Sequence, residues 1–170
     1  MQYANSQNTF RRYYFVIAVI VLMLDQATKS LVARNLPLHD TVTVIPGFFS
    51  ISHVLNPGAA FSLFADSASR YTTAGLIFFS VVVLSVVSTL LWRSGHAFTA
   101  GGLALALIMG GALGNLLDRI RLGSVIDFLM FNIGSYHWPD FNIADSAIVL
   151  GSLLLISDLF FHQEAAETRS

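Results

Sequence analysis

The sequence predicts an all-α membrane protein, with four transmembrane helices and a small extracytoplasmic β-structure between the first and second helix. Three observations lead to this class. Of the 170 residues, 55% are hydrophobic and only 11% are charged, whereas soluble domains usually carry about 25% charged residues. Four windows have the roughly 20 mostly apolar residues needed to cross a bilayer. The connection after the first window is rich in β-branched residues and turn signals.

The four windows indicate a single integral membrane domain over residues 1–170. They lie at about 13–33, 72–92, 97–117 and 141–161. A bundle of buried helices in a soluble protein would need a polar face on each helix, and the second window offers only Ser and Thr. A pair of arginines precedes the first window, as in a secretory signal peptide. No clean pattern of small residues for cleavage follows, so we expect this span to be retained.

The two longer connections differ in character. In the first, at about 35–71, a β-branched run at 41–45 is followed by Pro46-Gly47 and a second run at 48–52, which is typical of two strands joined by a turn. The second, at 118–140, contains an apolar segment at 125–133. We expect that segment to lie in the membrane interface or to re-enter the membrane edge.

Charge and cysteine content exclude several classes of protein. The formal net charge is −1 and cysteine is absent, so there is no basic excess for nucleic acid and no thiolate, disulfide or Cys-based metal site. No His-Glu-x-x-His motif is present, and the histidines show no ligand spacing. Four spans put both termini on one side of the membrane. Arginines flank the spans on both sides, so the positive-inside rule leaves the orientation open.

Carboxylates in membrane spans cost roughly 2.5–3.5 kcal/mol each, so they are either paired or functional. Asp25 and Lys29 stand four residues apart and share a helix face. Two interpretations remain open for them: a structural ion pair, or a wall that faces a substrate. Asp118 extends a row of small residues at a spacing of four, 102, 106, 110 and 114, which favours close helix packing. A neighbouring row holds Asn115 and Arg119.

Asp127 and Asp145 form the most informative pair. Asp127 lies in an apolar run, where poor solvation raises the pKa of a carboxyl group. Asp145 lies in the first turns of the fourth span, where a helix N-terminus favours negative charge, and Asn142 shares its face. Helix capping alone is an alternative explanation for each. Held close together, one carboxyl would keep a proton, which we assign to Asp127, and the other would act as a base. Such a pair can activate water and protonate a leaving amine, as in aspartic proteases.

Five sequence blocks in order resemble the bacterial lipoprotein signal peptidases, the signal peptidase II family of aspartic peptidases. The blocks are 24–29, 56–61, 110–119, 123–128 and 141–147, and the resemblance extends over about 13–161. One departure is Pro57, where Thr is more usual. Proline restricts Asn56 to extended geometry but leaves Asn56 and the following glycine in place.

The resemblance implies a multi-pass enzyme of the bacterial inner membrane, with both termini cytoplasmic and the active site near the outer leaflet. It implies removal of the signal peptide from diacylglyceryl prolipoproteins by a cut before the lipidated cysteine. Asp127 and Asp145 would be the catalytic dyad. The implied partners are these substrates, membrane lipid and peptide antibiotics that inhibit the family, with no metal, organic cofactor or nucleic acid. The implied substrate-binding or supporting residues are Asp25, Lys29, Asn56, Gly58, Asn115, Asp118, Arg119 and Asn142.

Two other hypotheses stay open from the residues themselves. A small transporter or proton relay would also carry intramembrane carboxylates; it predicts flux across liposomes without proteolysis. The second hypothesis is a non-enzymatic membrane scaffold, which predicts that the substitutions Asp127→Asn and Asp145→Asn are both tolerated.

Overall fold

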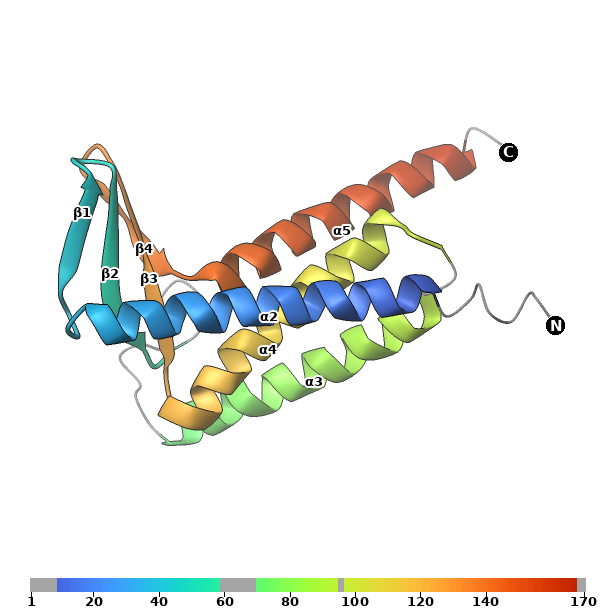
Figure 1. The fold of residues 1–170 in the computed structure, drawn as a ribbon. Helices are drawn as coiled ribbons and strands as arrows, with labels where there is room; N and C mark the ends of the chain where they lie inside the picture. The colour runs from blue at the N-terminus through green and yellow to red at the C-terminus, as the bar shows by residue number, and fades with distance from the viewer. Residues whose placement is uncertain (1–8, 59–69, 95–96, 168–170) are drawn as a thin grey trace.

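The computed structural model describes residues 9–58, 70–94 and 97–167, and within these ranges it contains four long helices and one antiparallel sheet (Figure 1). All four helices are long and apolar enough to cross a membrane. The predicted fold class, a multi-pass protein with four spans, is therefore confirmed. In chain order the helices are α2 (Thr9–Asn35), α3 (Arg70–Ser94), α4 (Ala100–Leu122) and α5 (Ile143–Glu167).

Helix α4 continues beyond the apolar window that predicted it. Thr99 caps its N-terminus by accepting the backbone N–H of Gly102, and Gly123 ends it in the left-handed conformation. The last turns therefore include Asp118, Arg119 and Arg121, which hydropathy alone leaves outside a span. Basic residues at this end suit the helix dipole, so the helix gains from the charges that interrupt its apolar pattern.

Helix α4 is also the centre of the bundle. Buried residues make up 56% of its apolar window, against at most 22% in the other three helices. It packs on α2, α3 and α5. Large apolar side chains on the outer faces of those three helices are exposed, among them Met23, Phe78 and Leu150. Such an exposed apolar surface is what a helix presents to lipid.

Small residues on α4 allow close contact with α2 and α5. A Cβ on Gly110 would lie 2.6 Å from the Ala18 carbonyl oxygen of α2. A Cβ on Gly111 would collide with the Ala144 carbonyl oxygen of α5. The row of small residues is thus a packing seam against α2, and the neighbouring row packs against α5.

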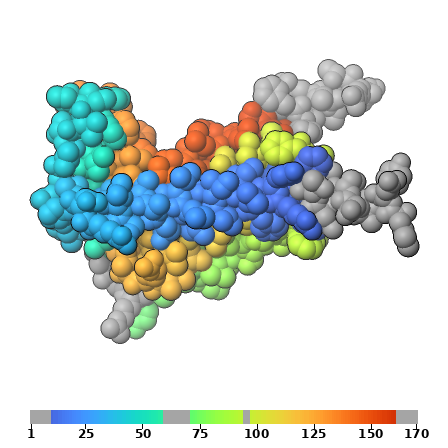
Figure 2. Space-filling model, in the orientation of Figure 1, coloured from blue at the N-terminus to red at the C-terminus, as the bar shows by residue number. Residues whose placement is uncertain are grey.

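The sheet has the strand order β1-β2-β3-β4 and stands at one end of the helices (Figures 1 and 2). The two strands predicted in the first connection are present, as β1 (Thr41–Ile45) and β2 (Phe49–Asn56). The other two, β3 (Val125–Ile133) and β4 (Tyr136–Phe141), come from the connection between α4 and α5.

The segment 125–133, expected to lie in the membrane interface or to re-enter the membrane edge, forms strand β3. Its position relative to the membrane stays a prediction. The strand pairs antiparallel with β2 on one side and with β4 on the other. Its first four residues are buried. A strand segment buried on both faces has a continuous apolar run, which hydropathy cannot distinguish from a segment that lies against lipid.

Candidate active site

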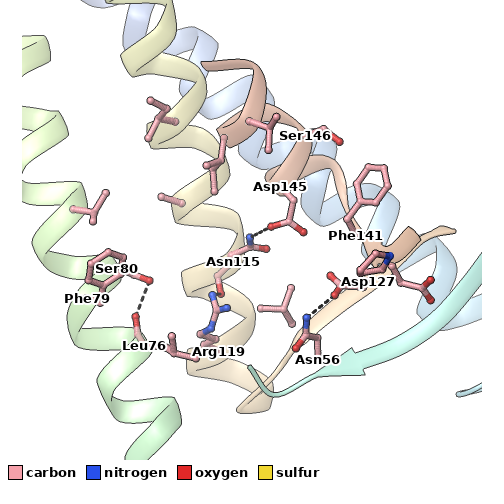
Figure 3. A pocket seen from close by; sticks show the side chains of 18 of the residues that line it. Asn56, Leu76, Phe79, Ser80, Asn115, Arg119, Asp127, Phe141, Asp145 and Ser146 are labelled. Carbon is pink, nitrogen blue, oxygen red and sulfur yellow. Dashed lines mark hydrogen bonds between the residues drawn. The ribbon is translucent and has the colours of Figure 1, made fainter. Parts of the chain in front are cut away.

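A cavity of about 800 Å³ lies between helices α3, α4 and α5 and the sheet. Its walls are mostly apolar, with side chains such as Leu76, Phe79 and Ile148. The charged residues among the described ones that line it are Arg119, Asp127, Asp140 and Asp145. In Figure 3, Asp145 enters this space from α5 and Asp127 enters it from β3. Two carboxylates far apart in the sequence therefore face one cavity.

The start of α5 holds Asp145 in place through a reciprocal cap. Asn142 Oδ1 accepts the Asp145 backbone N–H at 2.9 Å, and Asp145 Oδ2 accepts the Asn142 backbone N–H at 3.2 Å. This is a capping box, with the two side chains satisfying each other's free donors. The other oxygen, Oδ1, accepts the side-chain amide of Asn115 at 2.8 Å (Figure 3). The capping explanation of Asp145 is thus part of the geometry, and it also orients the carboxylate.

Asp127 accepts one hydrogen bond on each carboxylate oxygen. Asn142 donates to Oδ1 at 2.7 Å, and Asn56 donates to Oδ2 at 2.9 Å (Figure 3). Burial raises the pKa of Asp127 to about 7, and the nearby charge of Asp145 adds to the rise, while the hydrogen bonds from Asn56 and Asn142 oppose it. The protonated form of this carboxyl group is therefore favoured more than it is in an exposed aspartate.

The loop after β2 orients the amide of Asn56. The Gly58 backbone N–H donates to Asn56 Oδ1 at 2.9 Å, so the amide nitrogen is the atom left to face Asp127. Pro57 lies within this turn and leaves both flanking residues in place. The Gly58 carbonyl in turn accepts the Arg119 guanidinium at 3.0 Å. Residues 59–61 of the same sequence block lie outside the described residues.

Lys29 is the centre of a polar cluster behind the cavity. Its Nζ lies 2.9 Å from Asp25 Oδ2, 2.8 Å from Asp118 Oδ2 and 3.0 Å from Asn115 Oδ1. Lys29 and Asp25 are buried. By holding Asn115 Oδ1, the ammonium leaves the Asn115 amide to donate to Asp145.

The two carboxylates beside Lys29 extend the cluster to the elements that carry Asp145 and Asp127. Asp25 Oδ1 accepts the Ala144 backbone N–H in the first turn of α5, at 3.0 Å. Asp118 Oδ2 accepts the Ile126 backbone N–H at the start of β3, at 3.3 Å. The cluster therefore ties helix α2 to both elements.

The ten residues predicted for the site fall into two groups. The cavity lining includes Asn56, Asn115, Arg119, Asp127 and Asp145. The other five lie directly behind it and touch members of the first group or the cluster. They are Asp25, Lys29, Gly58, Asp118 and Asn142. For Asp25 and Lys29, this position favours the structural ion pair over the substrate-facing wall.

Sequence reasoning gave no role to two polar residues of this region. Gln26 donates to Asp118 Oδ1 at 2.9 Å and to Asp25 Oδ2 at 3.2 Å. Its signal was available, since it is a polar residue inside an apolar window. Asp140 lines the cavity and accepts the Ser52 hydroxyl. No local pattern marks it, because its partner is far away in the chain.

The fold and the site together define a multi-pass membrane protein with two aspartates in one largely apolar cavity. Comparison with known proteins makes the class specific. The family model described as signal peptidase (SPase) II matches residues 17–161. The lipoprotein signal peptidase of Geobacter sulfurreducens is 46% identical over 148 residues, which is 87% of this chain and 91% of that protein. The lipoprotein signal peptidase of Pseudomonas fluorescens is 40% identical and covers 96% of this chain and 97% of its own.

A solved structure of a membrane enzyme has the same fold. It is described as a bacterial membrane enzyme structure obtained by the in meso method at 2.3 Å resolution, and it superposes with a TM-score of 0.80 at 31% identity, covering 89% of each chain. This chain belongs to the signal peptidase II family, and it is a membrane-embedded protease that processes lipoproteins. The transporter and scaffold hypotheses are set aside by this membership.

Proposed function

We propose that this chain is an aspartic endopeptidase that removes the signal peptide of diacylglyceryl prolipoproteins by cutting before the lipidated cysteine, with Asp127 and Asp145 as the catalytic dyad. One observation carries the proposal. The two carboxylates face the same cavity, and Asn142 contacts both of them. A pair held this way in apolar surroundings favours one shared proton.

The protonation of the pair follows from its contacts. Asp127, whose pKa is raised to about 7 by burial, is assigned the proton in the resting enzyme. Asp145 accepts two hydrogen bonds at a helix N-terminus and is assigned the negative charge. The dyad titrates as a unit, so this assignment describes its dominant form.

The reaction follows from these assignments. Asp145 takes a proton from a water molecule as the water oxygen bonds to the carbonyl carbon of the peptide bond before the cysteine. Asp127 gives its proton to the carbonyl oxygen. The C–N bond of the resulting gem-diol then breaks as Asp145 gives its new proton to the cysteine nitrogen and one hydroxyl returns a proton to Asp127. The products are a carboxylic acid and a free amine, and the dyad is back in its starting protonation state. Arg119, held by the Gly58 carbonyl, is placed to contact the substrate backbone.

The apolar walls suit a lipidated substrate. Helices α3 and α5 line the cavity with side chains such as Phe79, Val83 and Leu150. Acyl chains on the substrate cysteine could move there from the bilayer at little cost, because lipid tails are about as apolar as these side chains. We place the enzyme in the bacterial inner membrane with both termini cytoplasmic. The sheet and the dyad would then lie near the outer leaflet. Peptide antibiotics that inhibit the family would compete for the same cavity.

The test is cleavage of a diacylglyceryl prolipoprotein by the purified enzyme in lipid. Asp127→Asn and Asp145→Asn keep the side-chain shape and remove the ionisable group. Each should reduce kcat by about 10⁴-fold or more, as expected when one member of an acid–base pair is removed. Asp40→Asn, which removes a charge from an exposed turn before β1, is the matched control. Wild-type cleavage by either dyad variant would refute the assignment, and cleavage at another bond would refute the cut position.

A further inference from the structure

Asp140 is a cavity carboxylate that the proposed reaction does not use. It lies on β4 and lines the same cavity as the dyad. Its side chain is 13% exposed. Ionised carboxylates are rarely buried to this extent unless they are paired or have a role in binding.

Asp140 and its partner Ser52 both lie at irregularities in the strand pairing. Leu129 pairs with Phe141 and Phe131 pairs with Trp138, so Pro139 and Asp140 together lie opposite Met130 alone. On the other side of β3, Ser52 also lies where the register between β2 and β3 shifts. Bulges of this kind redirect side chains and are frequent beside active sites.

The two strands that flank β3 are joined by a hydrogen bond between these residues. The Ser52 hydroxyl donates to Asp140 Oδ2 at 2.7 Å. Ser52 is almost fully buried, at 2% exposure. This contact holds the carboxylate of Asp140 in one orientation at the cavity wall.

The second oxygen of Asp140 has no such donor. Oδ1 is buried and accepts no hydrogen bond from the part of the chain that the structure describes. The nearest cationic group is His137 Nε2 at 3.4 Å, on a side chain that is half exposed. A buried carboxylate oxygen without a donor is costly, and a ligand in the cavity that supplied a donor would remove that cost.

The charges of the cavity indicate the kind of donor. Of the four titratable residues that line it, Asp127 is assigned the proton, which leaves Asp140 and Asp145 as the acidic groups. The fourth, Arg119, is engaged by the carbonyls of Gly58 and Asn115. A cationic side chain of the bound peptide would therefore be favoured beside Asp140.

We propose that Asp140 is a specificity-determining residue that pairs with a lysine or arginine of the substrate peptide near the scissile bond. This inference rests on the proposed function. Asp127 is two residues before Leu129 and Asp140 is one residue before its partner Phe141. The two aspartates are therefore about three residues, or roughly 10 Å, apart along the sheet. An extended peptide has the same rise, so the basic residue should stand about three positions from the cut.

The experiment uses the full-length enzyme in lipid and a set of diacylglyceryl prolipoprotein peptides. Each peptide keeps the lipidated cysteine and carries one Lys at a different one of the other positions, up to four residues on either side of the scissile bond, and each is compared with the matched Gln peptide. The measurement is the ratio of kcat/KM for the Lys peptide to that for the Gln peptide. At one position near the third residue, the wild type should favour Lys about tenfold, the size expected of one charged hydrogen bond.

Variants then assign this preference to Asp140. Asp140→Asn should bring the ratio close to one, and Asp140→Lys should reverse it in favour of a Glu peptide. Asp40→Asn removes the same charge from an exposed turn and should keep the wild-type ratio. A purely structural role for Asp140 would lower all rates together and would not make the ratio depend on substrate charge.

The outcomes separate this inference from the proposed function. If the wild type cleaves the Gln peptides but no position shows a Lys preference that Asp140→Asn removes, Asp140 is not a specificity residue and the proposed function stands. If the wild type cleaves none of the peptides, the proposed function fails and this inference fails with it.

Discussion

The side-chain amide of Asn142 donates a 2.7 Å hydrogen bond to Oδ1 of Asp127. The same residue caps helix α5, because its Oδ1 accepts the Asp145 backbone N–H. One asparagine therefore ties the orientation of the Asp127 carboxylate, on a strand, to that of Asp145, on a helix. Asn142 is completely buried, so it acts on the dyad by positioning.

Two substitutions of Asn142 distinguish its role as a helix cap from its contact with Asp127. Both Asn142→Ser and Asn142→Ala remove the amide donor, and we expect each to lower kcat by about 100-fold because the carboxylates lose their relative geometry. Only the Ala variant loses the N-cap. Its free energy of unfolding should therefore be about 1 kcal/mol lower than that of the Ser variant. Steady-state kinetics and denaturation in detergent measure the two effects. A Ser variant with wild-type kcat would contradict the positioning role.

The pH dependence of kcat/KM should reflect the loss of the proton from Asp127. Since the pKa of Asp127 is about 7 and the proposed reaction needs this group protonated, kcat/KM should fall as the pH rises through 7. The hydrogen bond from Asn56 stabilises the carboxylate and lowers that pKa. Asn56→Ala should therefore move the alkaline limb upward by about one pH unit.

The control for this shift is Asn35→Ala, which removes an amide at the exposed end of α2. Its pH profile should match that of the wild type. An alkaline limb that stays in place or moves to lower pH in Asn56→Ala would show that Asp127 is not the titrating group.

Lys29 should be a major determinant of stability. Lys29→Met would leave the buried carboxylates of Asp25 and Asp118 facing each other without a cation. Removing one partner of a buried ion pair typically costs about 3–5 kcal/mol. Arg12→Met removes a cation from an exposed position of the same helix and should change the stability by less than about 0.5 kcal/mol. Thermal unfolding in lipid or detergent distinguishes them, and equal effects would argue against a buried role for Lys29.

Close packing of α4 on α5 should be sensitive to one methyl group. In Gly111→Ala the new Cβ would collide with the Ala144 carbonyl oxygen and displace the start of α5, next to Asp145. We expect a loss of about 1–3 kcal/mol in stability, as for other overpacked sites, together with lower kcat. Gly75→Ala is the matched control, since its Cβ would meet nothing within 4 Å. Equal activity and stability in the two variants would disprove the packing seam.

Hydropathy and local patterns were sufficient for the helical half of this protein. A membrane span is a property of some 20 consecutive residues, so all four helices were predicted. The i, i+4 spacing placed Asp25 and Lys29 on one helix face and left an ion pair as one of two interpretations, and the structure shows that ion pair. The strands of the first connection were also predicted, because β-branched runs around Pro46-Gly47 are a local signal. The caps of α4, Thr99 and Gly123, were not predicted, since they depend on individual side-chain and backbone contacts.

What only the tertiary structure decided depends on contacts between distant segments. The pairing of β3 with β2 and β4 could not be predicted from its apolar run, because such a run has the same composition inside a sheet and against lipid. The amide of Asn142 reaches Asp127 only because the start of α5 lies against β3. Asp140 meets Ser52 across 88 residues through two irregular strand pairings. The sequence by itself determined the spans and the chemical groups, and long-range pairing determined which groups share a cavity.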